Sequence, residues 1–265
     1  MILITSTQRA VRDLRQGTLS PRLWILLAWN DLEAKYRRTI LGTFWQTLTS
    51  AAYIVGLTVV FSSIRGHRGD EFVLYLAAGY TAFSLISGFV SSGANAFQRG
   101  ASLLMAYDLP ASIHVYRAVT NEFIMFAHSL VIMLGVWIYS ETWPTVNTLL
   151  LFPALILMFA LGCGVVMTFG LLGARFRDVS PAVATVTSFL FLVTPIFWRR
   201  EDLGSRTWIV DLNPFYHATN LIRRPLMGEA PDPINWYVCI AMAIVSLILG
   251  TLGFIKYRRQ LVYWL

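Results

Sequence analysis

Charged residues are scarce in this chain. Asp, Glu, Lys and Arg make up 13% of its 265 residues, about half the fraction usual in soluble proteins. Hydrophobic residues make up 56%, and the mean hydropathy is +0.60. This composition excludes a disordered chain and argues against a soluble domain. The alternating segments of about ten residues that indicate an outer-membrane barrel are missing. We therefore expect an all-α integral membrane protein.

Lysine is rarer still, and its scarcity excludes one kind of chemistry. The sequence has two lysines, Lys35 and Lys256, and neither follows a glycine, so there is no Walker A phosphate loop. It also has no H-E-x-x-H or G-x-S-x-G motif. Cys163 and Cys239 each lie in an apolar run, and we interpret them as small core residues. We infer that the chain is not an enzyme and binds no metal or cofactor itself.

Long uncharged runs dominate the rest of the sequence. A helix needs about 20 mostly apolar residues to cross a bilayer, and six segments meet this requirement. We predict spans at residues 43–64, 72–92, 118–140, 147–173, 179–198 and 236–255. The whole chain, 1–265, is interpreted as one transmembrane domain. It consists of an N-terminal region (1–42), the six spans (43–255) and a tail (256–265).

The N-terminal region has an apolar run too short to span a membrane. Ser20 and Pro21 are typical of a helix start. The apolar run that follows ends in charged residues, which is typical of a helix lying in the membrane interface. A soluble helix packed on a partner is the alternative interpretation. Arginines are spread throughout residues 1–22, so we expect no cleavable signal peptide.

Basic residues are unevenly divided between the two sides of the predicted spans. Fourteen of the 21 lysines and arginines lie on the side of the termini. Because basic residues collect on the cytoplasmic side of membranes, we predict that both termini are cytoplasmic. The net charge of +7 then follows from topology and requires no nucleic-acid partner. The long polar connection 199–235 lies on the outer side and is predicted to hold two short helices, the second starting at Asn213 and Pro214.

Two ionisable residues, Glu122 and His128, lie in the predicted third span. Such residues usually face protein or water, because a charge at the bilayer centre costs roughly 2.5–3.5 kcal/mol on the insertion scale. They are therefore channel candidates. The alternative is that Glu122 reaches the cytoplasmic interface and that a neutral His128 is hydrogen-bonded between helices.

Four sequence patterns occur in a definite order along the chain. They are Lys35-Tyr36-Arg37 with Leu41-Gly42 and Trp45; Arg175-Phe176-Arg177-Asp178-Val179; Pro195-Ile196; and Asn213-Pro214 with Arg223. In these patterns the chain resembles the permease subunits of ABC exporters for polysaccharides, namely the O-antigen (Wzm-type), capsule and teichoic-acid permeases. The resemblance extends over about residues 20–260, and the six-span layout agrees with it.

The resemblance implies an assembly of two copies of this chain with two copies of a separate ATP-binding subunit, which holds ATP and Mg. The expected substrate is a lipid-linked polysaccharide of the O-antigen type, exported across the bacterial inner membrane. Capsule, teichoic acid or another amphiphile such as a drug is the alternative substrate. An ion-coupled carrier is the alternative class, but it predicts an internal repeat and more intramembrane charge than this sequence has.

The resemblance also assigns roles to residues. Residues 93–117 are expected to form the coupling segment, with re-entrant outer helices before the last span. At Met105-Ala106-Tyr107-Asp108 the chain departs from related permeases, which usually have basic residues there. Coupling to the ATPase is assigned to Ser102, Leu103, Leu104, Met105, Tyr107, Leu109, Pro110, Arg175, Arg177 and Asp178. The outer gate is assigned to Asn213, Pro214, Phe215 and Arg223.

The entrance for the substrate is expected at the start of the first span. It consists of Lys35, Tyr36, Arg37, Arg38 and Trp45. We hypothesise that Arg37 and Arg38 bind the lipid diphosphate, because the guanidinium fork matches phosphate geometry. Alternatively, both arginines contact anionic lipid headgroups or set the topology.

Overall fold

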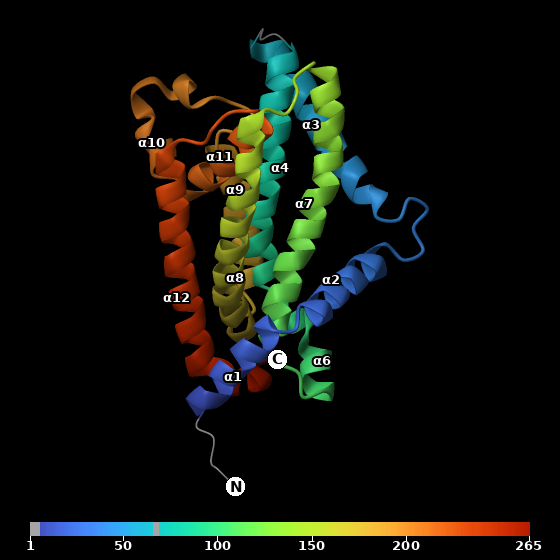
Figure 1. Ribbon diagram of the computed structural model, residues 1–265, viewed down its shortest axis with the longest axis vertical. Helices are drawn as coiled ribbons and strands as arrows, with labels where there is room; N and C mark the ends of the chain where they lie inside the picture. Colours follow the sequence, from blue (N-terminus) through green and yellow to red (C-terminus); the bar gives the residue numbers. More distant parts are fainter. Residues whose placement is uncertain (1–5, 66–68) are drawn as a thin grey trace.

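The chain folds into a bundle of long helices (Figure 1). This computed structural model describes residues 6–65 and 69–265, and no strand occurs in that part of the chain. The all-α class is therefore confirmed. The helices are α1 Ser6–Thr18, α2 Pro21–Tyr36, α3 Phe44–Arg65, α4 Gly69–Gly93, α5 Ala96–Arg99, α6 Ala101–Ala106, α7 Ile113–Tyr139, η1 Val146–Leu150, α8 Leu151–Arg175, α9 Val179–Val193, η2 Arg200–Arg206, α10 Trp208–Asp211, α11 Pro214–Leu226 and α12 Pro233–Trp264.

Five helical segments are long and apolar enough to cross a membrane. They are Phe44–Phe61, Glu71–Gly93, Ile113–Tyr139, Val146–Arg175 and Pro233–Trp264. They correspond in order to the predicted first four spans and the sixth. Helix α7 starts before the predicted residue 118, and α12 continues through the residues predicted as a tail. Nothing in that tail breaks a helix, because it contains neither glycine nor proline before Trp264.

The helix in the predicted fifth span, 179–198, is shorter than expected. Helix α9 ends at Val193, and its 15 residues extend over about 22 Å, less than the roughly 30 Å of a hydrocarbon core. Thr194 has an extended backbone (φ −83°, ψ 130°). It precedes Pro195, whose ring disfavours the helical conformation in the residue before it. The helix therefore stops before the apolar sequence does.

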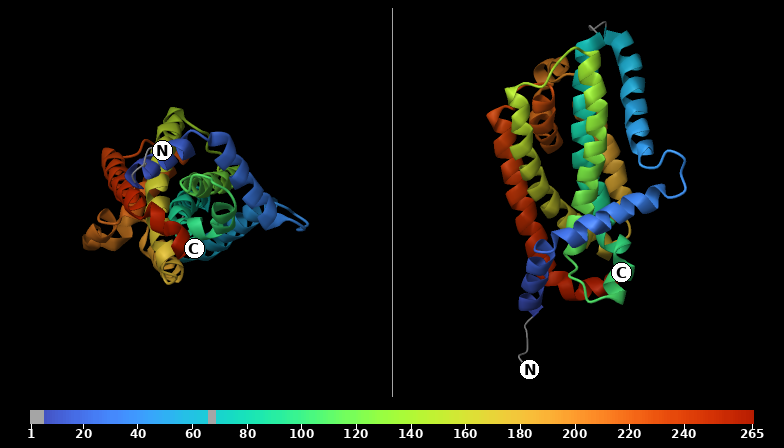
Figure 2. Two further views of the ribbon diagram at one scale, coloured as in Figure 1. Left: turned by 90° about the horizontal axis from the view of Figure 1, so that it is seen from below. Right: turned by 45° about the vertical axis from the view of Figure 1, so that its right-hand side comes forward.

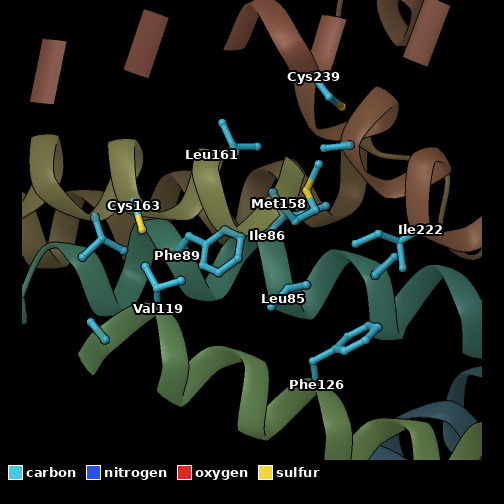
Figure 3. Close-up of a cluster of buried hydrophobic side chains, with 14 of the residues drawn as sticks. Leu85, Ile86, Phe89, Val119, Phe126, Met158, Leu161, Cys163, Ile222 and Cys239 are labelled. Carbon is cyan, nitrogen blue, oxygen red and sulfur yellow. The ribbon is translucent and has the colours of Figure 1, made fainter. Parts of the chain in front are cut away.

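Helix α4 is the central helix of the bundle. Its apolar segment is 61% buried, the highest share among the five long segments, and α4 packs against α7, α8 and α11. Figure 3 shows the core between these helices, with the labelled side chains of α4 lying between those of α7 and α8. These side chains are Leu85, Ile86, Phe89, Val119, Phe126, Met158 and Leu161. Cys163 and Cys239 are buried in the same core, as predicted.

Helices α8 and α12 have the most extensive mutual contact in the bundle. A Cβ atom on Gly164 would overlap the backbone and side chain of Ser246, and one on Gly250 would lie 3.0 Å from the Gly164 carbonyl oxygen. Glycine at these positions lets the two backbones approach closely. Close packing of this kind is a main source of helix association in membranes, where apolar burial drives little.

Two predicted helix starts differ in how they are capped. Asn213 caps α11, because its side-chain oxygen accepts a hydrogen bond of 3.0 Å from the Phe215 amide. Helix α2 starts at Pro21 as predicted, but Ser20 does not cap it. The Ser20 hydroxyl instead donates to the Gln16 carbonyl oxygen at 2.8 Å.

Helix α1 is fastened to the lower end of the bundle by one buried carboxylate (Figure 2). Asp13 is 5% exposed. It accepts hydrogen bonds from the Ala111 and Ser112 amides at 3.0 Å and from the Ser112 hydroxyl at 2.8 Å. Arg258 Nε on α12 donates to it at 2.5 Å. One side chain therefore joins α1, the start of α7 and the end of α12.

Replacing this carboxylate should destabilise the protein. We expect Asp13→Asn to lower the free energy of unfolding by about 3 kcal/mol, because it leaves Arg258 and two backbone amides with a poorer acceptor. Thermal unfolding of the protein in detergent measures the effect. Glu33→Gln removes an exposed carboxylate and is the control, with a change within about 0.5 kcal/mol. Equal melting temperatures of the two variants would contradict the role of Asp13.

Candidate functional site

Helix α2 runs obliquely across the lower part of the bundle and packs on α7 (Figure 2). Arg117 of α7 holds it there. Its guanidinium donates two hydrogen bonds to the Asp31 carboxylate, one of them 2.6 Å long. Trp24 lies against Tyr116, with ring centroids 5.9 Å apart. The role of Asp31 was not predicted, although a carboxylate in an interfacial helix beside a basic loop is a usable signal.

The predicted entrance residues lie at the far end of α2 and in the loop that leads to α3. The Tyr36 hydroxyl donates to Gln46 Oε1 at 3.2 Å and joins the two helices. Arg37 and Arg38 are exposed, and Trp45 is 43% exposed. Arg38 has a positive φ of 67°, a backbone conformation that is uncommon for residues other than glycine. The loop therefore presents both guanidinium groups outward, away from the bundle.

A cavity of about 510 Å³ lies between α2, α3, α4, α5 and α7. Glu122, one of the two channel candidates, lines it together with Lys35 and Arg99. His128, the other candidate, does not line this cavity. Its Nδ1 is hydrogen-bonded at 2.8 Å to the Ile124 carbonyl oxygen of its own helix. The two intramembrane candidates thus lie in different surroundings.

The two predicted coupling segments lie at the same end of the bundle (Figure 1). Gln98 Nε2 donates to the Gly173 carbonyl oxygen at 2.7 Å, and Asn95 Nδ2 donates to the Ser180 hydroxyl at 3.0 Å. These bonds connect the start of residues 93–117 to the α8–α9 connection. Met105 and Tyr107 are each 63% exposed.

The α8–α9 connection is also exposed. Arg175, Arg177 and Asp178 all have exposed side chains, and Arg175 lies over the Trp264 ring, 5.2 Å from its centroid. The other predicted coupling residues lie in α6 and in the segment that follows it, at the same end of the molecule.

The predicted gate residues come together at the other end of the bundle. Arg223 on α11 is 5% exposed, and its Nη1 donates to the Pro195 carbonyl oxygen at 2.7 Å. Its Nη2 donates to Asn220 Oδ1. Asn213 Nδ2 donates to the Thr194 hydroxyl at 3.0 Å. Two of the sequence patterns, Pro195-Ile196 and Asn213-Pro214 with Arg223, therefore form one hydrogen-bonded network.

Tyr75 on α4 completes this network, and sequence reasoning missed it. Its hydroxyl lies 3.1 Å from the Pro195 carbonyl oxygen and 3.0 Å from that of Trp198. The Arg223 guanidinium lies over its ring, 4.2 Å from the centroid, a cation–π contact. The ring of Phe215, another predicted gate residue, packs against that of Phe83, with the ring centroids 5.8 Å apart. Nothing in the sequence distinguishes Tyr75 from the other aromatic residues of the spans.

Ion pairs stabilise the polar connection 199–235 around this network. Arg200 donates two hydrogen bonds, of 2.7 and 2.6 Å, to the Asp211 carboxylate. These bonds hold the pKa of Asp211 below its ordinary value. His217 Nδ1 and Asn235 Oδ1 are 2.9 Å apart and link α11 to the start of α12. Within the described residues, no group of three or more His, Cys, Asp or Glu side chains is placed to hold a metal ion.

The Arg223 network should depend on the shape of the guanidinium and not only on its charge. We expect Arg223→Lys to lower the free energy of unfolding by about 1–3 kcal/mol, because an ammonium cannot bond Pro195 and Asn220 while stacking on Tyr75. The neighbouring Arg224 forms exposed ion pairs, so Arg224→Lys is the matched control and should change stability by less than about 1 kcal/mol. Thermal unfolding in detergent compares the two, and equal losses would contradict the network.

Comparison with known proteins agrees with this arrangement. Residues 22–227 match the model of the ABC-2 type transporter family. The O-antigen export system permease protein RfbA of Myxococcus xanthus is 26% identical over 78% of this chain and 79% of its own length. The polysialic acid transport protein KpsM of Escherichia coli is 23% identical over 83% of this chain and 87% of its own length.

The matched segment includes α2, the cavity, both predicted coupling segments and the whole Arg223 network. The family that the sequence patterns resemble is thereby confirmed. The chain is a multi-pass membrane protein and belongs to the ABC-2 type transporter family.

Proposed function

We propose that this chain is the membrane-spanning channel subunit of an ATP-driven exporter that moves a lipid-linked polysaccharide out of the cytoplasm. The match of residues 22–227 to the family, with relatives named for O-antigen export and polysialic acid transport, carries this proposal. The family implies a partner subunit that binds ATP, and this chain has no Walker A loop of its own.

In this proposal the chain crosses the membrane six times. Helix α9 alone is short for a crossing, but Trp198 lies shortly after its last residue, Val193. Tryptophan is typical of the membrane interface, so α9 and the segment up to Trp198 together form the fifth crossing. The short helices before α12 then re-enter the bundle from the outer side, and α11 is the one buried most deeply.

An even number of crossings places both termini on one side. The distribution of basic residues favours the cytoplasmic side of the bacterial inner membrane. The exposed loop with Arg37 and Arg38 and the predicted coupling residues then face the cytoplasm. Asn213, Pro214, Phe215 and Arg223 lie at the outer side.

A second copy of this chain is part of the proposal. A cavity of about 510 Å³ suits a ligand of drug size, whereas a polysaccharide needs a continuous hydrated path. Two copies can enclose such a path between them. Two ATP-binding subunits would push on the coupling residues and shift rigid helices between two arrangements.

The entrance hypothesis predicts a loss of export without a loss of assembly. We expect the double variant Arg37→Gln/Arg38→Gln to lower export by about tenfold or more, because two charge-assisted contacts to phosphate are removed. Export is measured in cells, and assembly by co-purification of the ATP-binding subunit. Arg206→Gln, which removes an exposed arginine near the other end, is the control. Full export by the double variant would rule out the entrance role and leave the headgroup or topology interpretation.

The coupling assignment predicts ATP hydrolysis without transport. We expect Met105→Ala/Tyr107→Ala to reduce the glycan exported per ATP hydrolysed by about tenfold, because the contact that transmits the movement of the ATP-binding subunit is removed. Both side chains are exposed, so the fold should tolerate the change. Leu212→Ala/Tyr237→Ala, at the opposite end and somewhat more exposed, is the matched control. An unchanged ratio in the purified complex would contradict the assignment.

A further inference from the structure

The cavity of about 510 Å³ between α2, α3, α4, α5 and α7 has cations at its rim. Lys35 and Arg99 line it and are both exposed. In the described part of the chain, neither forms an ion pair. The nearby carboxylate Asp31 also lines the cavity, but it is already neutralised by Arg117. The rim therefore offers two positive charges to an anion.

The inner wall of the same cavity offers hydrogen-bond acceptors. Asn121 Oδ1 is buried and has no hydrogen-bond partner, although buried polar atoms nearly always have one. The Glu122 carboxylate lies directly against Gly88 of α4, where even a methyl group would overlap it. These two neighbouring acceptors on α7 line the cavity, so a ligand that fills it should present donors to this wall.

Two serines on the wall keep acceptor capacity as well. Ser84 donates its hydroxyl hydrogen to the Thr81 carbonyl oxygen at 2.8 Å, and Ser129 donates to that of Met125 at 3.2 Å. Each hydroxyl oxygen can still accept from a ligand. The cavity thus combines a cationic rim with an acceptor-rich interior of about 510 Å³, a volume within the range of small-molecule sites.

We propose that this cavity binds the phosphate-linked first sugar of the exported lipid-linked glycan. Lys35 and Arg99 contact the phosphate at the rim, and Asn121 and Glu122 accept hydrogen bonds from sugar hydroxyls inside. The inference rests on the proposed function and gives it a second binding position, separate from the exposed arginines of the α2–α3 loop. A phospholipid headgroup shares the phosphate chemistry, but it has fewer hydroxyl donors for the inner wall.

The experiment measures binding to the purified complex of this chain with its ATP-binding subunit, by native mass spectrometry. Three probes separate the contributions. They are polyprenyl diphosphate bearing one N-acetylglucosamine, polyprenyl diphosphate without a sugar, and phosphatidylglycerol. Asn121→Leu removes an acceptor at nearly constant volume, Glu122→Gln replaces the carboxyl group by an amide of the same shape, and Arg99→Gln removes a rim cation. Leu134→Ala, on the same helix, exposed and outside the cavity lining, is the control.

We expect Asn121→Leu to weaken binding of the sugar-bearing probe by about tenfold, with a smaller loss for Glu122→Gln. Asn121→Leu should bind the bare diphosphate like the unaltered protein, and Glu122→Gln should bind it no more weakly, because it removes no cation from the rim. Arg99→Gln should weaken binding of both diphosphate probes, and Leu134→Ala should weaken binding of neither. The melting temperature of each variant identifies any that fails to fold. If Asn121→Leu fails to fold, the isosteric Glu122→Gln still tests the inner wall.

Three results would overturn the inference. Unchanged affinity of folded Asn121→Leu and Glu122→Gln for the sugar-bearing probe would show that the inner wall does not contact sugar and would leave the proposed function intact. Phosphatidylglycerol binding as tightly as the sugar-bearing probe would identify a lipid-headgroup site. Failure of the unaltered complex to bind either diphosphate would refute the proposed function as well.

Discussion

Backbone carbonyl groups inside a membrane protein must find hydrogen-bond donors within the protein, and much of the outer end follows from this requirement. Pro195 lies just past the end of α9, and the bends at residues 194–198 present carbonyl oxygens that no helix satisfies. The Pro195 oxygen accepts a hydrogen bond of 2.7 Å from Arg223. The Tyr75 hydroxyl lies 3.1 Å from the same oxygen and 3.0 Å from that of Trp198. Arg223 reaches the Pro195 oxygen because α11 packs against α4. The proline, the buried helix and the guanidinium are therefore one structural unit.

This unit also marks the limit of what the sequence predicts. Hydropathy located the long helices, because a run of apolar residues is a local property. It did not show that the helix of the fifth span ends at Val193, five residues before the predicted end of the span at 198, since hydropathy does not register where the backbone leaves the helix. Pro195 carried that signal. Arg223 and Asn213 were selected from the sequence patterns, but their bonds to residues 195 and 194 depend on tertiary packing, and Tyr75 had no signal.

At the lower end, charged residues do more than set topology. The same arginines and carboxylates that indicate a cytoplasmic face also tie surface helices to the bundle. Arg258 pairs with Asp13 and Arg117 with Asp31. The first pair joins residues 245 positions apart, a contact that no local pattern in a single sequence can reveal. The charge count predicts on which side of the membrane these residues lie, but only the fold shows which of them pair.

Helix α7 connects these features. Its start is held to α1 and α12 through Asp13, its first turns are held to α2 through Arg117, and the next turn carries Asn121 and Glu122 into the cavity. The predicted coupling residues of α6 directly precede it in the chain. Because α7 is unbroken over 27 residues, a displacement at its start must move the cavity wall with it. In the proposed function, a push on α6 therefore reaches the binding cavity through a single rigid helix. The hydrogen bonds to α1 and the ion pair with α2 determine how far that helix can shift.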